Sequence, residues 1–129
     1  RILAPGGVVR IVVPDIEQCL RAYQENNAGF FQQRIEHWGA GDGKATRLEH
    51  FLAYAGAGPD PAWLFEAHKF GYDFETLERA LQRVGFKAIT RSSFMGSQHP
   101  ALRVDEHSQV ASAKFGDQYY SLFVEAIKE

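Results

Sequence analysis

Apolar positions near the start of the chain form one run without alternation. Residues 8–13 read Val-Val-Arg-Ile-Val-Val, β-branched at every position except Arg10. β-branched residues favour extended backbone, and an unalternated run is typical of a strand covered on both faces, as in parallel sheets. The Pro-Gly-Gly triplet at 5–7 predicts a tight turn before the strand. Pro14 has no N–H to donate, so the strand is expected to end there.

The apolar positions that follow recur with a helical period. Ile16, Cys19, Leu20 and Tyr23 have the spacing i, i+3, i+4, i+7, which predicts an amphipathic helix capped by Asp15. Less regular apolar positions predict a second short helix over 30–38 and a third over 46–55. Because 26–69 contains no strand-like alternation, this region is expected to be a helical insertion.

The strongest helical pattern lies later, over 73–86. Leu77, Leu81 and Val84 form its apolar stripe, Asp73 is the expected N-cap, and Gly85 suits a left-handed C-terminal residue. The pattern then predicts a strand over 87–92 and a last strand over 119–127. Between them the chain is polar, and only 103–112 favours a short helix.

This order of elements predicts an α/β fold. Strands joined by helix-bearing connections are typical of a sheet covered by helices. The length of 129 residues suits one domain over 1–129, with the helical insertion at 26–69 inside it.

Composition narrows the function classes. The net charge is −2 and no Lys/Arg cluster is present, which removes the electrostatic basis for binding nucleic acid. No apolar run approaches the ~18 residues of a membrane span. A single cysteine suits a reducing cytoplasm, which is the expected location. The chain begins with Arg1 rather than Met, so a truncated fragment is expected.

Several segments together resemble class I S-adenosylmethionine-dependent methyltransferases, in particular the type 11/12-like group. Leu3-Ala4-Pro5-Gly6-Gly7 and the strand up to Pro14 resemble the passage from the family's fourth helix into its fifth strand. The segment from Tyr72-Asp73 through Leu77 and Leu81 to Gly85-Phe86 resembles the passage into its sixth strand. The closing segment over 119–128 resembles its seventh strand. The resemblance covers nearly the whole chain but only the carboxyl-terminal half of the family's domain.

The resemblance implies a partial Rossmann-like methyltransferase sheet. Its three strands would have the order 5-7-6, with the last strand antiparallel between the other two. The family binds S-adenosylmethionine in the half that this chain does not resemble, on a glycine-rich turn between a strand and a helix. No such turn is visible here, since the Gly-rich stretch at 39–43 does not follow a predicted strand. We therefore expect no cofactor-binding residue, no bound cofactor and no activity from this chain alone.

Three residues are candidates for the acceptor side of the site, although the catalytic residues are otherwise unknown. Asp15 ends a strand where α/β proteins bind ligands, but a helix cap is the simpler interpretation. His68 precedes the helix at 73–86, and an imidazole is a suitable general base near neutral pH. Tyr72 lies four positions after His68 and is a candidate of the same standing. A surface histidine is the competing interpretation of His68.

The other reactive residue types favour no separate site. The five histidines contain no H-x-H or H-x-x-x-H pair, so no metal site is expected. His50 follows Glu49 and is a further, weaker candidate for a ligand or base. Cys19 lies on the apolar stripe of its helix, where a buried small hydrophobic residue is more common than a nucleophile.

The sequence leaves two functions open. The first is the acceptor-side portion of a methyltransferase that acts on an unidentified small molecule. The second is a non-catalytic oligomeric interaction module derived from the same fold. An apolar strand without a neighbour tends to pair with another chain. We therefore expect a homo-oligomer joined through Val8–Val13 or through the apolar surface beside this strand, with no nucleic acid and no membrane as partners.

Overall fold

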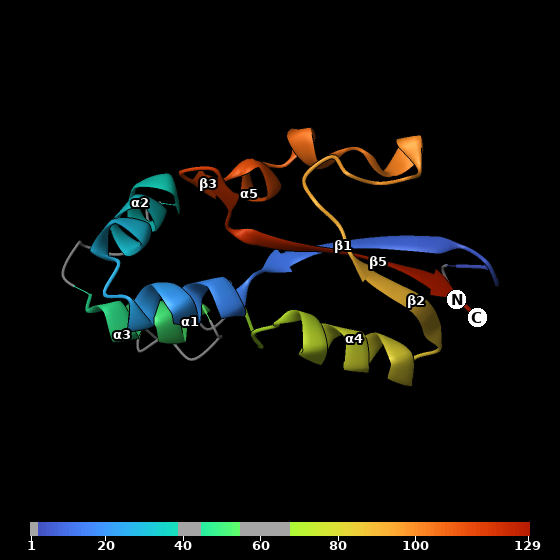
Figure 1. Ribbon diagram of the computed structural model, residues 1–129, viewed down its shortest axis with the longest axis horizontal. Helices are drawn as coiled ribbons and strands as arrows, with labels where there is room; N and C mark the ends of the chain where they lie inside the picture. Colours follow the sequence, from blue (N-terminus) through green and yellow to red (C-terminus); the bar gives the residue numbers. More distant parts are fainter. Residues whose placement is uncertain (1–2, 39–44, 55–67) are drawn as a thin grey trace. The chain divides into compact units, whose positions relative to one another are not determined.

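The computed structural model describes residues 3–38, 45–54 and 68–129. Its residues divide into two compact units, Arg1–Pro14 with Asp73–Glu129, and Asp15–Tyr72. The first, the sheet unit, holds the strands, and the described part of the second, the helical unit, holds three helices (Figure 1). The expected mixture of helices and strands is confirmed. The single domain over 1–129 with an insertion at 26–69 stays a prediction.

The sheet unit is built on three strands in the order β1, β5, β2. They are β1 (Val8–Pro14), β5 (Ser121–Lys128) and β2 (Phe86–Arg91). β5 is antiparallel to both neighbours, and the β1 register places Val8 opposite Ile127 and Pro14 opposite Ser121. The first and last strands of the chain therefore lie side by side (Figure 1). β5 is buried along most of its length, as the central strand of a sheet is expected to be.

β1 differs from its expected environment. Every residue of β1 is partly exposed to solvent and none is fully exposed, so the expectation of a strand covered on both faces is met only in part. Its pairing with β5 is antiparallel, and within the described residues no other strand pairs with it. The reason is that β-branched composition reports a preference for pleated backbone and does not count the layers that cover it.

The turn before β1 forms as its residues predict. Gly6 adopts φ +80°, a conformation open to glycine at little cost. Its N–H donates to the carbonyl of Lys128 over 2.8 Å, and the Gly7 N–H donates to the carbonyl of Ala4 over 3.0 Å. The turn thereby ties the start of β1 to the end of β5.

Helix α4 (Phe74–Arg83) precedes β2 and packs on it. The carboxylate of Asp73 accepts the Thr76 N–H over 2.8 Å, which confirms the predicted cap. Leu77 and Leu81 are buried as predicted. Val84 is 61% exposed, so its place in the buried stripe is wrong. It lies at the C-cap, where the helix has already ended and the backbone no longer follows the helical period.

β2 contains an irregularity. Its register with β5 shifts between Lys87 and Thr90, and Ala88 within this interval has φ +48°. A left-handed residue in a strand is typical of a β-bulge, which bends and twists the edge of a sheet.

The segment between β2 and β5 is more broken than expected. The helix predicted over 103–112 is replaced by a 3₁₀ turn, η3 (Asp105–His107), and one turn of helix, α5 (Gln109–Ser112). Another 3₁₀ turn, η2 (Pro100–Leu102), precedes them. A small hairpin then forms from β3 (Lys114–Phe115) and β4 (Gln118–Tyr119), so the last strand starts at Ser121 rather than 119. Ser108 caps α5 and interrupts the expected longer helix.

The helical unit contains α1 (Ile16–Gln24), α2 (Ala28–Trp38) and α3 (Arg47–Tyr54), close to the predicted ranges. Its buried residues are Cys19, Ala22, Phe30 and Phe31. The predicted stripe of α1 is only partly right, because Leu20 is 43% and Tyr23 is 37% exposed. Ala22 is buried instead, since the width of the contact, and not the period alone, decides which neighbouring positions are covered.

Candidate functional site

Asp15 acts as a helix cap in the structure. Its backbone is extended, with φ −84° and ψ 99°, and its carboxylate accepts the N–H of Gln18 over 3.3 Å. This satisfies one of the N–H groups that the first turn of α1 leaves without a helical partner. The simpler interpretation of Asp15 is therefore confirmed, and its candidate role in the site stays a prediction.

Tyr72 lies next to Asp15 through the backbone. The two residues form an isolated parallel bridge, in which the N–H of Ile16 donates to the carbonyl of Tyr72 over 3.1 Å. The Tyr72 ring meets the Phe70 ring edge to face, with 5.1 Å between centroids. The structure thus brings together two of the three sequence candidates, although 57 positions separate them in the numbering.

His68, the third candidate, belongs to the same helical unit, and its side chain is in part exposed to solvent and in part covered. Partial burial of its imidazole, together with the positive charge of Arg34 in α2, lowers the pKa of His68. A lowered pKa keeps the ring neutral at pH 7, which is the form that accepts a proton. Chemically, His68 is thus the best available base among the three candidates.

Arg34 influences a second histidine. Burial, and then the charge of Arg34, lower the pKa of His50 in α3, while Glu49 opposes this effect. The Nε2 atom of His50 is buried and has no hydrogen-bond partner among the described residues. The charge of Arg34 is therefore the second cause, after burial, of the lowered pKa of both histidines. Arg34 is not among the residues expected from the sequence. The available signal was its position four residues after Phe30 and three after Phe31, a charge placed on the apolar face of its helix.

Cys19 is fully buried in the same unit. Burial raises the pKa of its thiol to about 11, although the Arg34 charge acts in the opposite direction. Because the thiolate is the reactive form, this cysteine is inert at neutral pH. The prediction of a buried small hydrophobic residue is confirmed.

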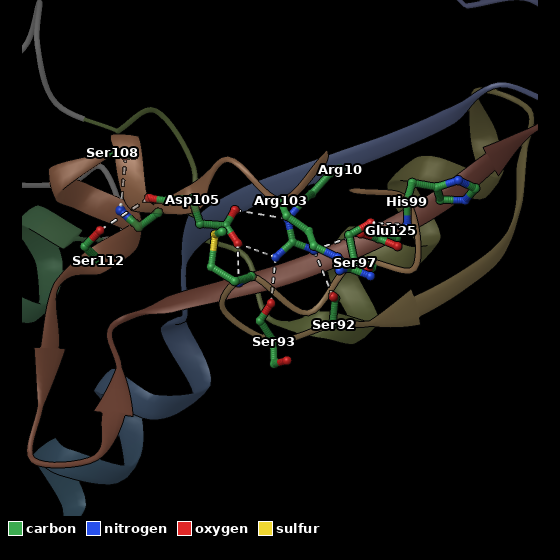
Figure 2. Close-up of polar contacts among 12 residues, drawn as sticks. Arg10, Ser92, Ser93, Ser97, His99, Arg103, Asp105, Ser108, Ser112 and Glu125 are labelled. Atoms are coloured by element: carbon green, nitrogen blue, oxygen red, sulfur yellow. Dashed lines mark hydrogen bonds and ion pairs between the residues drawn. The ribbon is translucent and has the colours of Figure 1, made fainter. Parts of the chain in front are cut away.

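A different polar cluster lies in the sheet unit, around Arg10 of β1 (Figure 2). Nε and Nη2 of Arg10 bind the two carboxylate oxygens of Asp105 over 3.0 and 2.7 Å. Nη1 donates to Glu125 and to the hydroxyl of Ser92, both over 2.8 Å. Nη2 also donates to the carbonyl of Ser93 over 2.6 Å. We call these five residues the Arg10 cluster.

The charges of the Arg10 cluster are almost fully buried. The side chains of Arg10 and Asp105 are 4% and 3% exposed. Burial by itself would raise the pKa of Asp105, but the hydrogen bonds from Arg10 and from the Met95 N–H, with the Arg10 charge, lower it. The hydrogen bond to Asp105 raises the pKa of Arg10 in turn. Both groups are therefore charged at neutral pH.

The Arg10 cluster is built for stability rather than for binding. A guanidinium has five N–H donors, and each has an acceptor within the cluster. No donor remains for a substrate. The cluster instead fastens the segment after β2, through Asp105 and Ser93, to the strand pair β1 and β5. Figure 2 shows these contacts converging on the guanidinium.

In the sequence, Arg10 stands out only as the single polar residue of its predicted strand. A lone charge inside a β-branched run is nonetheless a usable signal, because a charge is rarely buried without a partner. The partners of Arg10 could not be predicted from the sequence, because Asp105 lies 95 positions away.

The described titratable side chains outside these groups include one exposed pair in the sheet unit. His107 approaches Glu106 to 3.9 Å, and both side chains are exposed. Within the described ranges, no three His, Cys, Asp or Glu residues are placed to share a metal ion. In those ranges no helix is both long and apolar enough to cross a membrane. The Gly-rich stretch at 39–43 lies outside the described residues.

S-Adenosylmethionine, the cofactor that the resemblance implies, does not fit the strand-to-helix turn that the structure describes after β1. The connection from β1 to α1 is the single residue Asp15, so it contains no glycine. The Asp15 carboxylate already occupies the N-terminus of α1. Comparison of the chain with protein-family models, with curated proteins and with solved structures finds no match.

Proposed function

We propose that this chain is the acceptor-side portion of a class I S-adenosylmethionine-dependent methyltransferase. One observation carries the proposal, namely the order β1, β5, β2 with the last strand antiparallel between the other two. Under the proposal these strands correspond to the fifth, seventh and sixth strands of the family's Rossmann-like sheet, the order 5-7-6. The Pro-Gly-Gly turn before β1 and the left-handed Gly85 before β2 support the same correspondence.

The proposal gives the helical unit the acceptor side of the site. Asp15, His68 and Tyr72 are its candidate residues, and all three belong to this unit. In methyl transfer most of the rate enhancement comes from placing the acceptor, so a single neutral base suffices to remove its proton. The lowered pKa of His68 suits that role. The cofactor-binding residues belong to the part of the family's domain that this chain does not resemble.

The test is to read the coding frame upstream and to express the whole frame. We expect the added segment to encode a strand followed by a glycine-rich turn. Calorimetry with S-adenosylmethionine should then show micromolar binding by the longer protein and none by residues 1–129. A longer protein that carries no such turn, or that does not bind the cofactor, would refute the proposal.

The role of His68 is tested in that longer protein. His68→Gln should lower methyl transfer by about 10²-fold, because a general base is lost. His99→Gln is the matched control, since His99 is an exposed histidine of the sheet unit. The readout is S-adenosylhomocysteine formation with a panel of small-molecule acceptors. Equal rates for the two variants would remove His68 from the mechanism.

We also propose a second function, a non-catalytic oligomeric interaction module. The observation that favours it is the position of β1 at the edge of the sheet, with partial exposure along all seven residues. An edge strand presents backbone donors and acceptors to any strand that approaches. The homo-oligomer is part of this second proposal.

A further inference from the structure

The two edge strands of the sheet, β1 and β2, differ in how easily another strand could pair with them. The β2 edge carries the bulge at Ala88 and the charges of Lys87 and Arg91, features that obstruct pairing with another strand. The register of β1 runs without a shift from Val8 to Pro14. Its only charge, Arg10, is turned onto Asp105 and Glu125 of its own sheet unit. The β1 edge is therefore the open one.

The hydrogen bonds of β5 show which β1 groups face outward. Ser92 N–H donates to the carbonyl of Phe123 over 2.8 Å, so the odd-numbered residues of β5 direct their backbone toward the β2 side. By alternation, the even-numbered residues bond to β1, where their register partners are Val9, Ile11 and Val13. The backbone groups of Val8, Arg10 and Val12 consequently point away from the sheet. Among the described residues none bonds to them.

The outward N–H and C=O groups of one β1 strand can form hydrogen bonds with the same groups of a second copy. In an antiparallel pair of β1 strands centred on Ile11, Arg10 lies opposite the second copy's Val12, and Val8 lies opposite the second copy's Pro14. The two Arg10–Val12 pairs form on the order of four hydrogen bonds. The Val8–Pro14 pairs add less, because Pro14 has no N–H and the next residue, Asp15, is already bridged to Tyr72. A register centred on Arg10 forms at least as many bonds but sets two arginines directly opposite each other, which is unfavourable. The Ile11-centred register instead places only Val and Ile opposite one another on the face of Val9, Ile11 and Val13.

We propose that this chain forms a two-fold symmetric dimer in which β1 pairs antiparallel with β1 of a second copy, centred on Ile11. The pairing joins the two three-stranded sheets into one continuous sheet. It satisfies the outward N–H and C=O groups of Arg10 and Val12 in both copies, without any change in the β1–β5 register. The inference rests on the second proposed function, the interaction module, and is an alternative to the methyltransferase proposal, in which a further strand of the family's sheet would pair with this edge of β1.

Disulfide cross-linking tests the register. Residues opposite each other in a non-hydrogen-bonded antiparallel pair have Cα atoms about 4.5 Å apart, within reach of a disulfide. Ile11→Cys chains should therefore link to each other under mild oxidation. Val9→Cys chains should not link to themselves but should link to Val13→Cys chains. The parent chain is the control, because its buried Cys19 has a thiol pKa raised to about 11.

A proline substitution tests the backbone bonds in the full 129-residue chain. Val12→Pro removes one outward N–H per copy, and proline is tolerated on the open side of an edge strand. Light scattering should show a dimer dissociation constant at least about tenfold weaker than in the parent. Val12→Ala keeps the N–H and should remain dimeric. Circular dichroism of both variants verifies that the fold is retained.

The outcomes separate this inference from the function on which it rests. A dimer with linked Ile11→Cys chains and a weakened Val12→Pro variant supports the inference. A dimer whose Ile11→Cys chains do not link, or whose Val12→Pro variant associates as tightly as Val12→Ala, overturns β1 pairing but keeps the interaction module. A parent chain that stays monomeric at about 100 μM, a concentration at which even a weak dimer would form, overturns both β1 pairing and the interaction module.

Discussion

Two arginines organise the polar chemistry of this molecule, one in each unit. Arg10 is surrounded by acceptors and balances the buried Asp105 and the partly buried Glu125 in the sheet unit. Arg34 lies close enough to two histidines of the helical unit to lower the pKa of each. The first arginine stabilises a fold, because all its donors are used. The second changes the protonation of neighbouring groups, which is a property that a reaction can use.

The Arg10 cluster predicts an acid-sensitive sheet unit. Asp105→Asn keeps the shape of the side chain but removes its charge, and should lower the free energy of unfolding by about 3 kcal/mol at pH 7. The folded pKa of Asp105 is below its unfolded value. Its stabilisation is therefore present above about pH 4 and is lost as the pH falls through the folded pKa. Urea unfolding at pH 7 and at successively lower pH measures this, and the difference between the two proteins should shrink as the Asp105 carboxyl is protonated.

Glu106→Gln is the matched control for Asp105→Asn. Glu106 is the next residue along the chain, but its side chain is 60% exposed. Its substitution should change the free energy of unfolding by less than about 0.5 kcal/mol. Equal effects of the two substitutions would contradict a special role for the buried ion pair.

Arg34→Gln should raise the pKa of both His50 and His68. The change should be partial, because burial is the larger cause of both lowered values and remains in the variant. Proton NMR of the imidazole C–H signals against pH measures it. The control is Arg47→Gln, whose guanidinium binds Asn26 over 2.6 Å. Unchanged histidine titrations in Arg34→Gln would show that burial alone sets them.

The lowered pKa values of His50 and His68 also make the stability of the helical unit depend on pH. Because both histidines have folded pKa values below the unfolded value of about 6.5, their unfolded forms bind protons first as the pH falls. The helical unit should therefore be most stable above pH ~6.5 and lose stability below it. In Arg34→Gln this loss should be smaller.

At the scale of the elements, the ends of helices and strands follow local chemistry. Asp15, Asp73 and Ser108 each accept an N–H from the first turn of the helix that follows. Gly6 and Gly85 have φ near +80°, where other residues are strained. The Lys128 ammonium also binds the carbonyls of Val84 and Gly85, each over 2.8 Å, and so completes the end of α4.

Replacing these two glycines separates backbone strain from a contact. Gly6→Ala should cost about 1 kcal/mol through its positive φ alone, since nothing lies within 4 Å of an added Cβ. Gly85→Ala should cost about 1 kcal/mol more, because its Cβ would lie 2.6 Å from the Lys128 Nζ and would displace it from two carbonyls. Denaturant unfolding of both variants measures the difference. Equal losses would show that Lys128 adds nothing to this helix end.

At the scale of the whole molecule, the sheet unit joins the two ends of the chain. β1 and β5 pair across more than a hundred intervening positions, and the helical unit is formed by a continuous stretch, Asp15–Tyr72. Each unit has its own buried residues, such as Leu122 in one and Phe30 in the other. Local unfolding of one unit should therefore be able to occur without unfolding of the other.

Hydrogen exchange tests this separation. Phe30→Ala should accelerate exchange of the α1–α3 amides, and Leu122→Ala should accelerate exchange of the β1 and β5 amides. Each substitution removes a buried side chain and should destabilise its own unit by about 2–5 kcal/mol. If both variants accelerate the same amides equally, the chain unfolds as one cooperative body instead.

The sequence by itself determined the local elements of this protein. The Pro-Gly-Gly turn, the caps at Asp15 and Asp73 and the left-handed Gly85 depend on residues a few positions apart, so their chemistry is legible without a fold. Periodicity also identified the helices, but it overstated the burial of Leu20, Tyr23 and Val84. The candidates Asp15, His68 and Tyr72 could be named from the sequence, whereas the influence of Arg34 on the two histidines could not.

Only the tertiary structure decided which distant residues meet. It placed Asp105 on Arg10 across 95 positions, joined Asp15 to Tyr72 through the backbone, and left β1 at an edge with its outer backbone groups pointing away from the sheet. The physical reason is that ion pairs and strand neighbours depend on how elements pack. Local propensity carries no information about a partner that the chain brings back from its far end.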